Sequence, residues 1–311
     1  MKIAILGATS QIAKDLILSF RAYTEYELVL FSRAPQKVLA QFEALGIKID
    51  CENLSYDGFS SIDNYDVIIN FVGVGDPAVA KQMGCAIFDV TYQYDKLALD
   101  YLQQHPQTKY IFLSSGAVFG GDFEQPITED SVAQVDLNHL KESDWYGIAK
   151  LYAEARHRAL KDCAIVDVRV FNYFSHTQDM NARFLITDIV RAIQNNEVLK
   201  TAETNIVRDF ITPFDFAHII KTMIESAAIN TAVDCYTQAP IDKLSLLKSL
   251  QEKFGLCYEL VTSAGLNATG AKINYYSMNK KAAEFGYVPS MKSDTGVVLE
   301  IARYLTASDH A

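Results

Sequence analysis

Cysteine is scarce in this chain, and its few copies form no recognisable framework. The 311 residues include five cysteines, an odd number, and no two of them stand at the spacing of a zinc or disulfide motif. The six histidines likewise form no pair at metal-ligand spacing. We therefore expect reduced thiols, no disulfide and no metal.

Long hydrophobic runs and an excess of positive charge are absent as well. Half of the residues are hydrophobic, but the longest apolar runs have the length of a strand and are too short to cross a bilayer as a helix. Met1-Lys2 enters such a run directly and not through a signal peptide, so we expect a cytoplasmic location and no membrane partner. The net charge of −10 disfavours a nucleic-acid partner, although it allows a local cationic pocket for phosphates.

The chain does contain an alternation of short apolar runs with helix-like stretches. This alternation predicts an α/β fold with a doubly wound parallel (Rossmann) sheet that helices cover on both faces. We expect a dinucleotide-binding domain over residues 1–170, to which 207–233 returns, and a smaller C-terminal α/β substrate-binding lobe over 171–311. Residues 95–104 and 144–160 are predicted to be amphipathic helices. The predicted strands are 2–6, 27–31, 47–51, 67–72, 86–90, 110–113 and 165–170.

Residues 2–20 have the pattern of a strand, a tight turn and a helix. Small residues stand at Gly7, Ser10 and Ala13, where a dinucleotide-binding turn lets backbone N–H groups at a helix start approach a pyrophosphate. Only the first is glycine, so a plain buried strand and turn is the alternative, and Ser10 can cap the helix or donate to a phosphate. The cofactor-binding residues expected here are Gly7, Thr9, Ser10, Gln11 and Ile12.

A serine, a tyrosine and a lysine further along the chain form a pattern for proton transfer. On a helix, Tyr146 and Lys150 share a face, so the ammonium can stabilise a phenolate and lower the pKa of the tyrosine. Such a tyrosine exchanges a proton with a carbonyl or an alcohol. Tyr92 with Lys96 and Tyr276 with Lys280 have the same spacing. Only the Tyr146 copy follows a strand that ends in two serines, within a chain that opens on a nucleotide-binding pattern.

Five motifs in this order resemble the extended short-chain dehydrogenase/reductase family, the NAD-dependent epimerase/dehydratase group that acts on nucleotide sugars. The resemblance runs from Lys2 to about Ile220, and the last ninety residues match the family only in length. The motifs are Gly-Ala-Thr-Ser-Gln-Ile-Ala, Leu-Ser-Ser-Gly-Ala-Val-Phe-Gly, Trp-Tyr-Gly-Ile-Ala-Lys-Leu-Tyr-Ala-Glu, Val-Arg-Val-Phe-Asn and Arg-Asp-Phe-Ile-Thr-Pro-Phe-Asp-Phe-Ala.

The resemblance implies roles for individual residues. Tyr146 would be the proton donor, Lys150 would also bind the nicotinamide ribose, and Ser115 would polarise the substrate carbonyl. Ser114, beside that serine, is also expected to contact the substrate. The resemblance places Asn172, Asn181 and Arg208 at the diphosphate region of the substrate, where a guanidinium can grip phosphate oxygens. For Arg208 a salt bridge with Asp209 or Asp215 is the alternative, and for Asn172 a turn or cap.

The choice of cofactor depends on the end of the second strand, where an acid favours NAD and a base favours NADP. Here the chain has Ser32 and Arg33, with Lys37 one turn later, so NADP(H) is favoured over NAD(H). A solvated surface arginine is the alternative. By resemblance, further cofactor contacts fall at Asn53, Leu54, Phe71, Val72 and Gly73.

The expected activity is NADPH-dependent reduction of a keto group on a nucleotide-activated (4-keto-6-deoxy) sugar. Gly116-Ala117 stands where dehydratases of the family have an Asp-Glu pair, so a 4,6-dehydratase is disfavoured. One alternative is a nucleotide-sugar epimerase that retains NAD(P), and another is a non-catalytic nicotinamide-nucleotide sensor. In the family the helices that match 95–104 and 144–160 commonly form a dimer interface, so a homodimer is expected.

Overall fold

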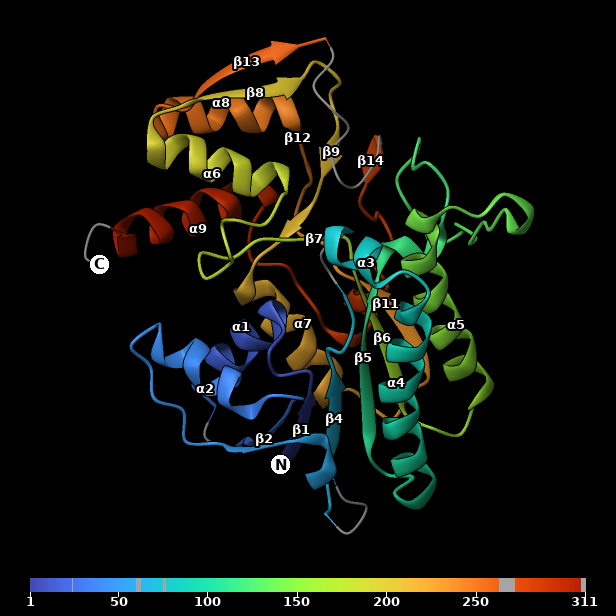
Figure 1. Ribbon diagram of the computed structural model, residues 1–311. Helices are drawn as coiled ribbons and strands as arrows, with labels where there is room; N and C mark the ends of the chain where they lie inside the picture. The colour runs from blue at the N-terminus through green and yellow to red at the C-terminus, as the bar shows by residue number, and fades with distance from the viewer. Residues whose placement is uncertain (24, 60–62, 75–76, 263–271, 309–311) are drawn as a thin grey trace.

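A seven-stranded parallel sheet forms the centre of the protein (Figure 1), and this confirms the predicted fold class. The computed structural model describes all residues except 24, 60–62, 75–76, 263–271 and 309–311. The strand order is β11-β6-β5-β4-β1-β2-β3. The strands of this sheet are β1 (Lys2–Leu6), β2 (Glu27–Phe31), β3 (Glu52–Leu54), β4 (Val67–Asn70), β5 (Lys109–Ser115), β6 (Ile165–Val170) and β11 (Thr231–Asp234).

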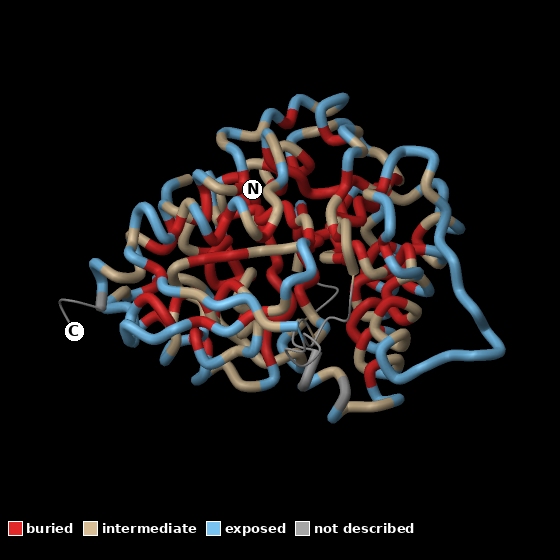
Figure 2. The backbone as a smooth tube through the Cα atoms, turned by 90° about the horizontal axis from the view of Figure 1, so that it is seen from above, coloured by how far each residue is buried: buried red, intermediate tan, exposed pale blue. Residues whose placement is uncertain are grey.

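Helices cover both faces of this sheet. Helices α1 (Gln11–Phe20), α2 (Pro35–Glu43) and α7 (Pro213–Glu225) lie on one face, and α4 (Ala86–Gln104) and α5 (Trp145–Ala159) on the other (Figure 1). A separate apolar cluster fills each face. The strands are apolar at successive positions because both of their faces are buried. Figure 2 shows this buried centre under a layer of more exposed backbone.

Two predicted strands are wrong. Residues 86–90 begin helix α4, whose buried side chains recur at helical spacing from Ile87 through Thr91 to Ala98. A five-residue apolar run cannot reveal that period, which becomes visible only over the whole helix. Residues 47–51 belong to no strand. The third strand is the shorter β3, which begins directly after them and pairs with β2.

Most of the segments after β6, apart from α7 and β11, build a second lobe with its own apolar core. In Figure 1 this lobe lies at the carboxyl ends of the parallel strands, beyond the last residues of β1 and β5. No helix among the described residues is long and apolar enough to cross a membrane. The lobe contains β7 (Asn172–Tyr173), α6 (Leu185–Asn195), β8 (Val198–Ala202), β9 (Val207–Arg208), β10 (Phe210–Ile211), β12 (Ile241–Asp242), α8 (Lys243–Phe254), β13 (Cys257–Val261), β14 (Asn274–Tyr275) and α9 (Ser293–Ser308), and α3 (Pro77–Met83) precedes α4.

Candidate active site

The predicted cofactor residues lie along the carboxyl ends of neighbouring strands. Gly7 follows β1 in a left-handed conformation (φ 80°), and a Cβ there would lie 2.9 Å from the backbone nitrogen of Val72. Phe71 donates its backbone N–H to the Leu6 carbonyl at 2.8 Å, which joins the ends of β1 and β4. Glycine is required at this turn both for its φ and for the close approach of the two backbones.

The side chains at the start of α1 are partly engaged elsewhere. Gln11 donates to Asp15 at 2.9 Å and to Thr177 at 2.7 Å, which ties the helix to the loop after β7. Ile12 packs against the core, and the Thr9 carbonyl accepts a hydrogen bond from a side chain of α2. Ser10 stands at the N-cap without a capping hydrogen bond from its side chain. The groups of this turn that suit a pyrophosphate are therefore the backbone N–H groups of the first helical turn and the hydroxyl of Ser10.

A hollow of about 430 Å³ lies beside the ends of β2 and β3. Arg33, which is exposed, lines it together with Tyr56 and Asp57, so it holds both a basic and an acidic side chain. Next to Arg33, the hydroxyl of Ser32 is buried and has no hydrogen-bond partner among the described residues.

The other predicted residues of this end are placed close by. Asn53 donates to the Pro35 carbonyl at 2.9 Å, and the Leu54 carbonyl accepts from the backbone of Ser32 at 3.1 Å. Lys37 is exposed on α2. Sequence reasoning missed Tyr56 and Asp57, which follow β3 and carry no motif.

Ser115 and Tyr146 meet at the end of β5. Ser115 ends the strand, and its Oγ accepts a hydrogen bond from the backbone N–H of Ala117 at 3.2 Å. Tyr146, at the start of α5, lies close enough to this hydroxyl for Ser115 to act on the pKa of its phenol. Gly147 allows the approach, since a Cβ there would lie 2.5 Å from the carbonyl oxygen of Ala117. The predicted serine and tyrosine are thus brought together.

Lys150 follows one turn along α5 and is buried under the end of the sheet. Its Nζ donates to the Leu113 carbonyl at 2.7 Å and lies 4.2 Å from the ring centre of Phe112. A Cβ on Gly73 would come within 3.1 Å of this Nζ, so the small residue makes room for the ammonium. Burial lowers the pKa of Lys150 to about 8.

The expected lowering of the Tyr146 pKa is not found. Burial raises the pKa of this phenol, and Ser115 only partly opposes the rise. Lys150 directs its ammonium at backbone carbonyls instead. The i, i+4 spacing placed the two residues on one helix, but it could not show which acceptor the lysine takes.

Ser114 is not part of this group. Its hydroxyl donates to Glu154 at 2.6 Å, and Glu154 in turn pairs with Arg169. Successive side chains of a strand point to opposite faces, so Ser114 and Ser115 cannot both face the same site. Ser114 thus joins β5 to α5.

Arg208 lies in β9 and is buried. It donates to the Val207 and Ile273 carbonyls and, within the described part of the chain, pairs with no carboxylate. Neither Asp209, which accepts from the backbone of Thr237, nor Asp215, which accepts from that of Ser290, forms a salt bridge with Arg208, so this alternative does not hold. Burial lowers the pKa of Arg208 to about 10.

A second cation, Lys272, lies close to Arg208. Both face the ring of Tyr275, at 4.4 Å for the Lys272 Nζ and 5.9 Å for the guanidinium carbon. Burial, followed by the charge of Arg208, lowers the pKa of Lys272 to about 8. Sequence reasoning missed Lys272 and Tyr275 because no motif covers this part of the chain.

The two predicted asparagines are placed differently. Asn172 donates from Nδ2 to the Tyr275 carbonyl at 2.8 Å, so it anchors the strand that carries this tyrosine. Asn181 is exposed and bonds to Asp179 within its own loop. The structure brings only Asn172 into contact with the group around Ser115.

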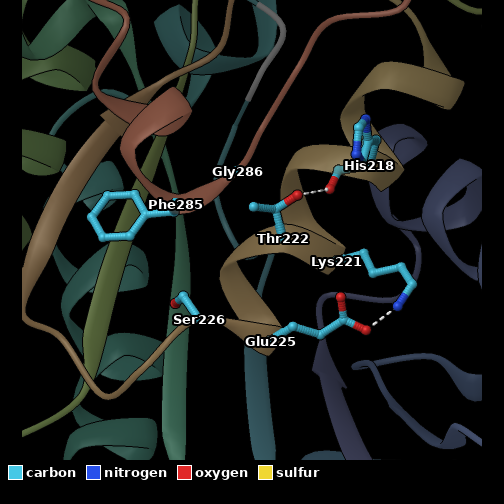
Figure 3. Close-up of a pocket in the computed structure, with 7 residues that line it drawn as sticks. All are labelled: His218, Lys221, Thr222, Glu225, Ser226, Phe285 and Gly286. Atoms are coloured by element: carbon cyan, nitrogen blue, oxygen red, sulfur yellow. Dashed lines mark hydrogen bonds and ion pairs between the residues drawn. The ribbon is translucent and has the colours of Figure 1, made fainter.

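A cavity of about 290 Å³ lies elsewhere, between α7 and the turn at Gly286 (Figure 3). Its polar groups pair with one another: Lys221 with Glu225, and the Thr222 hydroxyl with the His218 carbonyl. It includes none of the predicted site residues. No group of three or more potential metal ligands occurs among the described residues.

The sheet, the glycine turn and the Ser-Tyr-Lys group define an extended short-chain dehydrogenase/reductase. The family model of the NAD dependent epimerase/dehydratase family matches residues 3–234. The chain belongs to that family, which confirms both the resemblance and the predicted enzyme class.

Solved structures of similar fold extend over the whole chain. UDP-glucuronic acid 4-epimerase from Bacillus cereus, in complex with NAD, is 16% identical over 99% of both chains with a TM-score of 0.75. UDP-glucose 4-epimerase from Thermotoga maritima, with UDP-glucose, is 17% identical over 99% of both chains with a TM-score of 0.77. dTDP-glucose 4,6-dehydratase from Bacillus anthracis, in complex with NAD, is 15% identical over 99% of this chain and 98% of that chain, with a TM-score of 0.79. No curated protein matches the chain in sequence.

Proposed function

We propose that the protein interconverts an alcohol and a ketone at one carbon of a nucleotide-activated sugar. The observation that carries this proposal is the contact of Ser115 with Tyr146 at the end of β5, one helical turn before the buried Lys150. A hydroxyl that polarises an oxygen and a phenol that exchanges its proton are what this reaction requires.

The residues present fit a nicotinamide dinucleotide. The turn at Gly7 leaves no space for a side chain, and the buried Ser32 hydroxyl has no partner among the described residues. The start of α1 would hold the pyrophosphate, and the hollow beside Arg33 would hold the adenosine end. Lys150 would hold the nicotinamide ribose. The bound nicotinamide supplies and accepts the hydride.

The substrate diphosphate fits the pair of cations at Arg208 and Lys272. Arg208 is buried and Lys272 is half-buried, and a positive charge withdrawn from water favours an anion beside it. Among the described residues Asp144 acts on Lys272 through its charge, but no carboxylate forms an ion pair with either cation. A guanidinium and an ammonium side by side suit the oxygens of two phosphates. Several of the structurally similar proteins are complexes with UDP or a UDP-sugar.

The proton steps follow from the contacts at the end of β5. In the direction of reduction, Tyr146 gives its proton to the substrate oxygen while Ser115 donates a hydrogen bond to the same oxygen. In the direction of oxidation, Tyr146 takes the proton back. Lys150 takes no part in this proton transfer, because its ammonium is held by the Leu113 carbonyl.

These steps are compatible with two net reactions, epimerisation and reduction of a keto sugar. A different observation favours each of them. The similar structures include several epimerases, which favours epimerisation with a retained NAD. Arg33 at the adenosine hollow favours a consumed NADPH, and hence a keto-sugar reductase, since it can bind a 2′-phosphate. The expected homodimer and the cytoplasmic location remain predictions.

Absorbance of the reduced nicotinamide distinguishes the outcomes. A reductase consumes NADPH in proportion to a 4-keto-6-deoxy nucleotide sugar, and an epimerase interconverts two nucleotide hexoses without net absorbance change. Each activity is measured by product chromatography alongside absorbance, with Tyr146→Phe as the control. If no sugar of a UDP-, dTDP-, GDP- and CDP-linked panel binds in a thermal-shift assay with either cofactor, the proposed substrate class is wrong.

A further inference from the structure

Tyr275 lies against the proposed catalytic serine but has no part in the steps described so far. Its hydroxyl is 3.3 Å from Oγ of Ser115, and the residue is 9% exposed. Ser115 ends a strand of the central sheet, whereas Tyr275 lies in β14 of the second lobe. The second lobe therefore places a second phenol beside the serine that would polarise the substrate oxygen.

The position of this tyrosine is fixed by backbone pairing and packing. Strand β14 is parallel to β9, with Tyr275 beside Arg208 in the register. Asn172 donates a hydrogen bond to the Tyr275 carbonyl. The centre of the Tyr275 ring lies 4.7 Å from that of Phe123, which it meets edge-on, and 5.3 Å from that of Phe171, to which it is tilted. Two ring contacts and an anchored backbone restrain the Tyr275 hydroxyl, so its contact with Ser115 belongs to the folded structure of the site.

The hydrogen-bond capacity of Ser115 shows what the contact does. A serine hydroxyl has one hydrogen and two acceptor lone pairs. One lone pair accepts the N–H of Ala117. If Tyr275 donates to the other, the serine hydrogen can only point outward, to the oxygen shared with Tyr146. Burial raises the pKa of Tyr275, so its phenol keeps the proton that it has to donate.

We infer that Tyr275 is a positioning residue of the active site, whose phenol donates to Ser115 Oγ and directs the serine hydrogen toward the substrate oxygen. This inference rests on the proposed function. The hydroxyls of Tyr275, Ser115 and Tyr146 form a chain in which the first orders the second. The opposite polarity, in which Ser115 donates to Tyr275, would take the serine hydrogen away from the substrate.

The kinetic test is Tyr275→Phe, which removes the hydroxyl and keeps the ring with its packing. We expect kcat to fall roughly 3- to 10-fold, as for one lost neutral hydrogen bond, while KM for the nucleotide sugar stays nearly unchanged. Tyr276→Phe is the matched control and should leave both constants unchanged. In a Ser115→Ala background, Tyr275→Phe should add no further loss. An unchanged or increased kcat, or an additive loss with Ser115→Ala, would overturn the inference.

A second measurement needs no substrate. In protein with ¹³Cζ-labelled tyrosines, the signal of Tyr146 is assigned by its loss in Tyr146→Phe. Tyr275→Phe and Ser115→Ala should each move this signal at neutral pH, and Tyr276→Phe should not. An unmoved signal in Tyr275→Phe would contradict the inference even in an active enzyme. If the signal moves but no Tyr146-dependent turnover is found with any sugar, the proposed function fails and the hydroxyl chain stands.

Discussion

Replacing Tyr146 by phenylalanine tests the proton-transfer step. The change removes one hydroxyl, on which Ser115 acts, and keeps the aromatic ring. The free energy of unfolding should fall by only ~0.5–1.5 kcal/mol, the net value of one hydrogen bond. Lys150 should keep its position because its anchors are the Leu113 and Val72 carbonyls. We therefore expect a folded variant with nearly unchanged cofactor affinity.

Turnover of the same variant should fall by ~10²-fold or more, the contribution of a general acid, which raises the barrier by about 2.7 kcal/mol. Cofactor binding is measured by titration calorimetry and turnover by product formation. Tyr152→Phe is the matched control, since Tyr152 lies on the same helix and is 51% exposed. Turnover of Tyr146→Phe near the wild-type level would show that another group moves the proton.

Two further predictions concern the cofactor and the folded state. Arg33→Ala should weaken NADPH binding by roughly 1.5–3 kcal/mol and NADH binding much less, because only NADPH carries the 2′-phosphate; Lys48→Ala is the control, and equal losses in calorimetry would refute the preference. Burial opposes the charge of His157, but the carboxylates of Asp167 and Asp95, at 2.6 and 2.7 Å, outweigh it and raise the pKa to about 9. This contribution to stability is complete below pH ~6.5 and is lost as the pH rises through about 9. His157→Leu should therefore lower the free energy of unfolding by roughly 3 kcal/mol at pH 7. The decrease of this free energy between pH 7 and pH 10 should be smaller in the variant than in the wild type. Equal pH slopes of the two proteins in thermal melts would contradict this assignment.

The parts of the site that the sequence predicts are those where one local pattern determines the geometry. Gly7 follows a strand and precedes a helix, and the turn between them can take only a few shapes. Tyr146 and Lys150 share a helix, so their spacing in the sequence already gives their spacing in space. The end of β5 is also predictable, because a parallel strand must deliver its last residues to the ligand-binding edge of the sheet.

The rest depends on contacts between distant segments. Lys272 and Tyr275 reach the site through pairing of β14 with β9, and no short pattern encodes that pairing. The hydroxyl of Ser114 is directed away from the site by the pleat of the strand, and its partner Glu154 lies forty residues further on. The acceptor of the Lys150 ammonium is likewise a tertiary contact. Local patterns predict the helix or strand on which each residue lies, but they do not predict the residue that it contacts.

The order of strands in the sheet has a consequence for synthesis of the chain. Strand β11 is the only neighbour of β6 on its outer side, yet the second-lobe segments from β7 to β10 and helix α7 separate them in the sequence. As the ribosome makes the protein, β6 therefore has an open edge until residues 231–234 emerge. A strand with unpaired N–H and C=O groups can pair with a neighbouring nascent chain. While the stretch between β6 and β11 is being translated, this edge of the sheet is therefore open to such pairing.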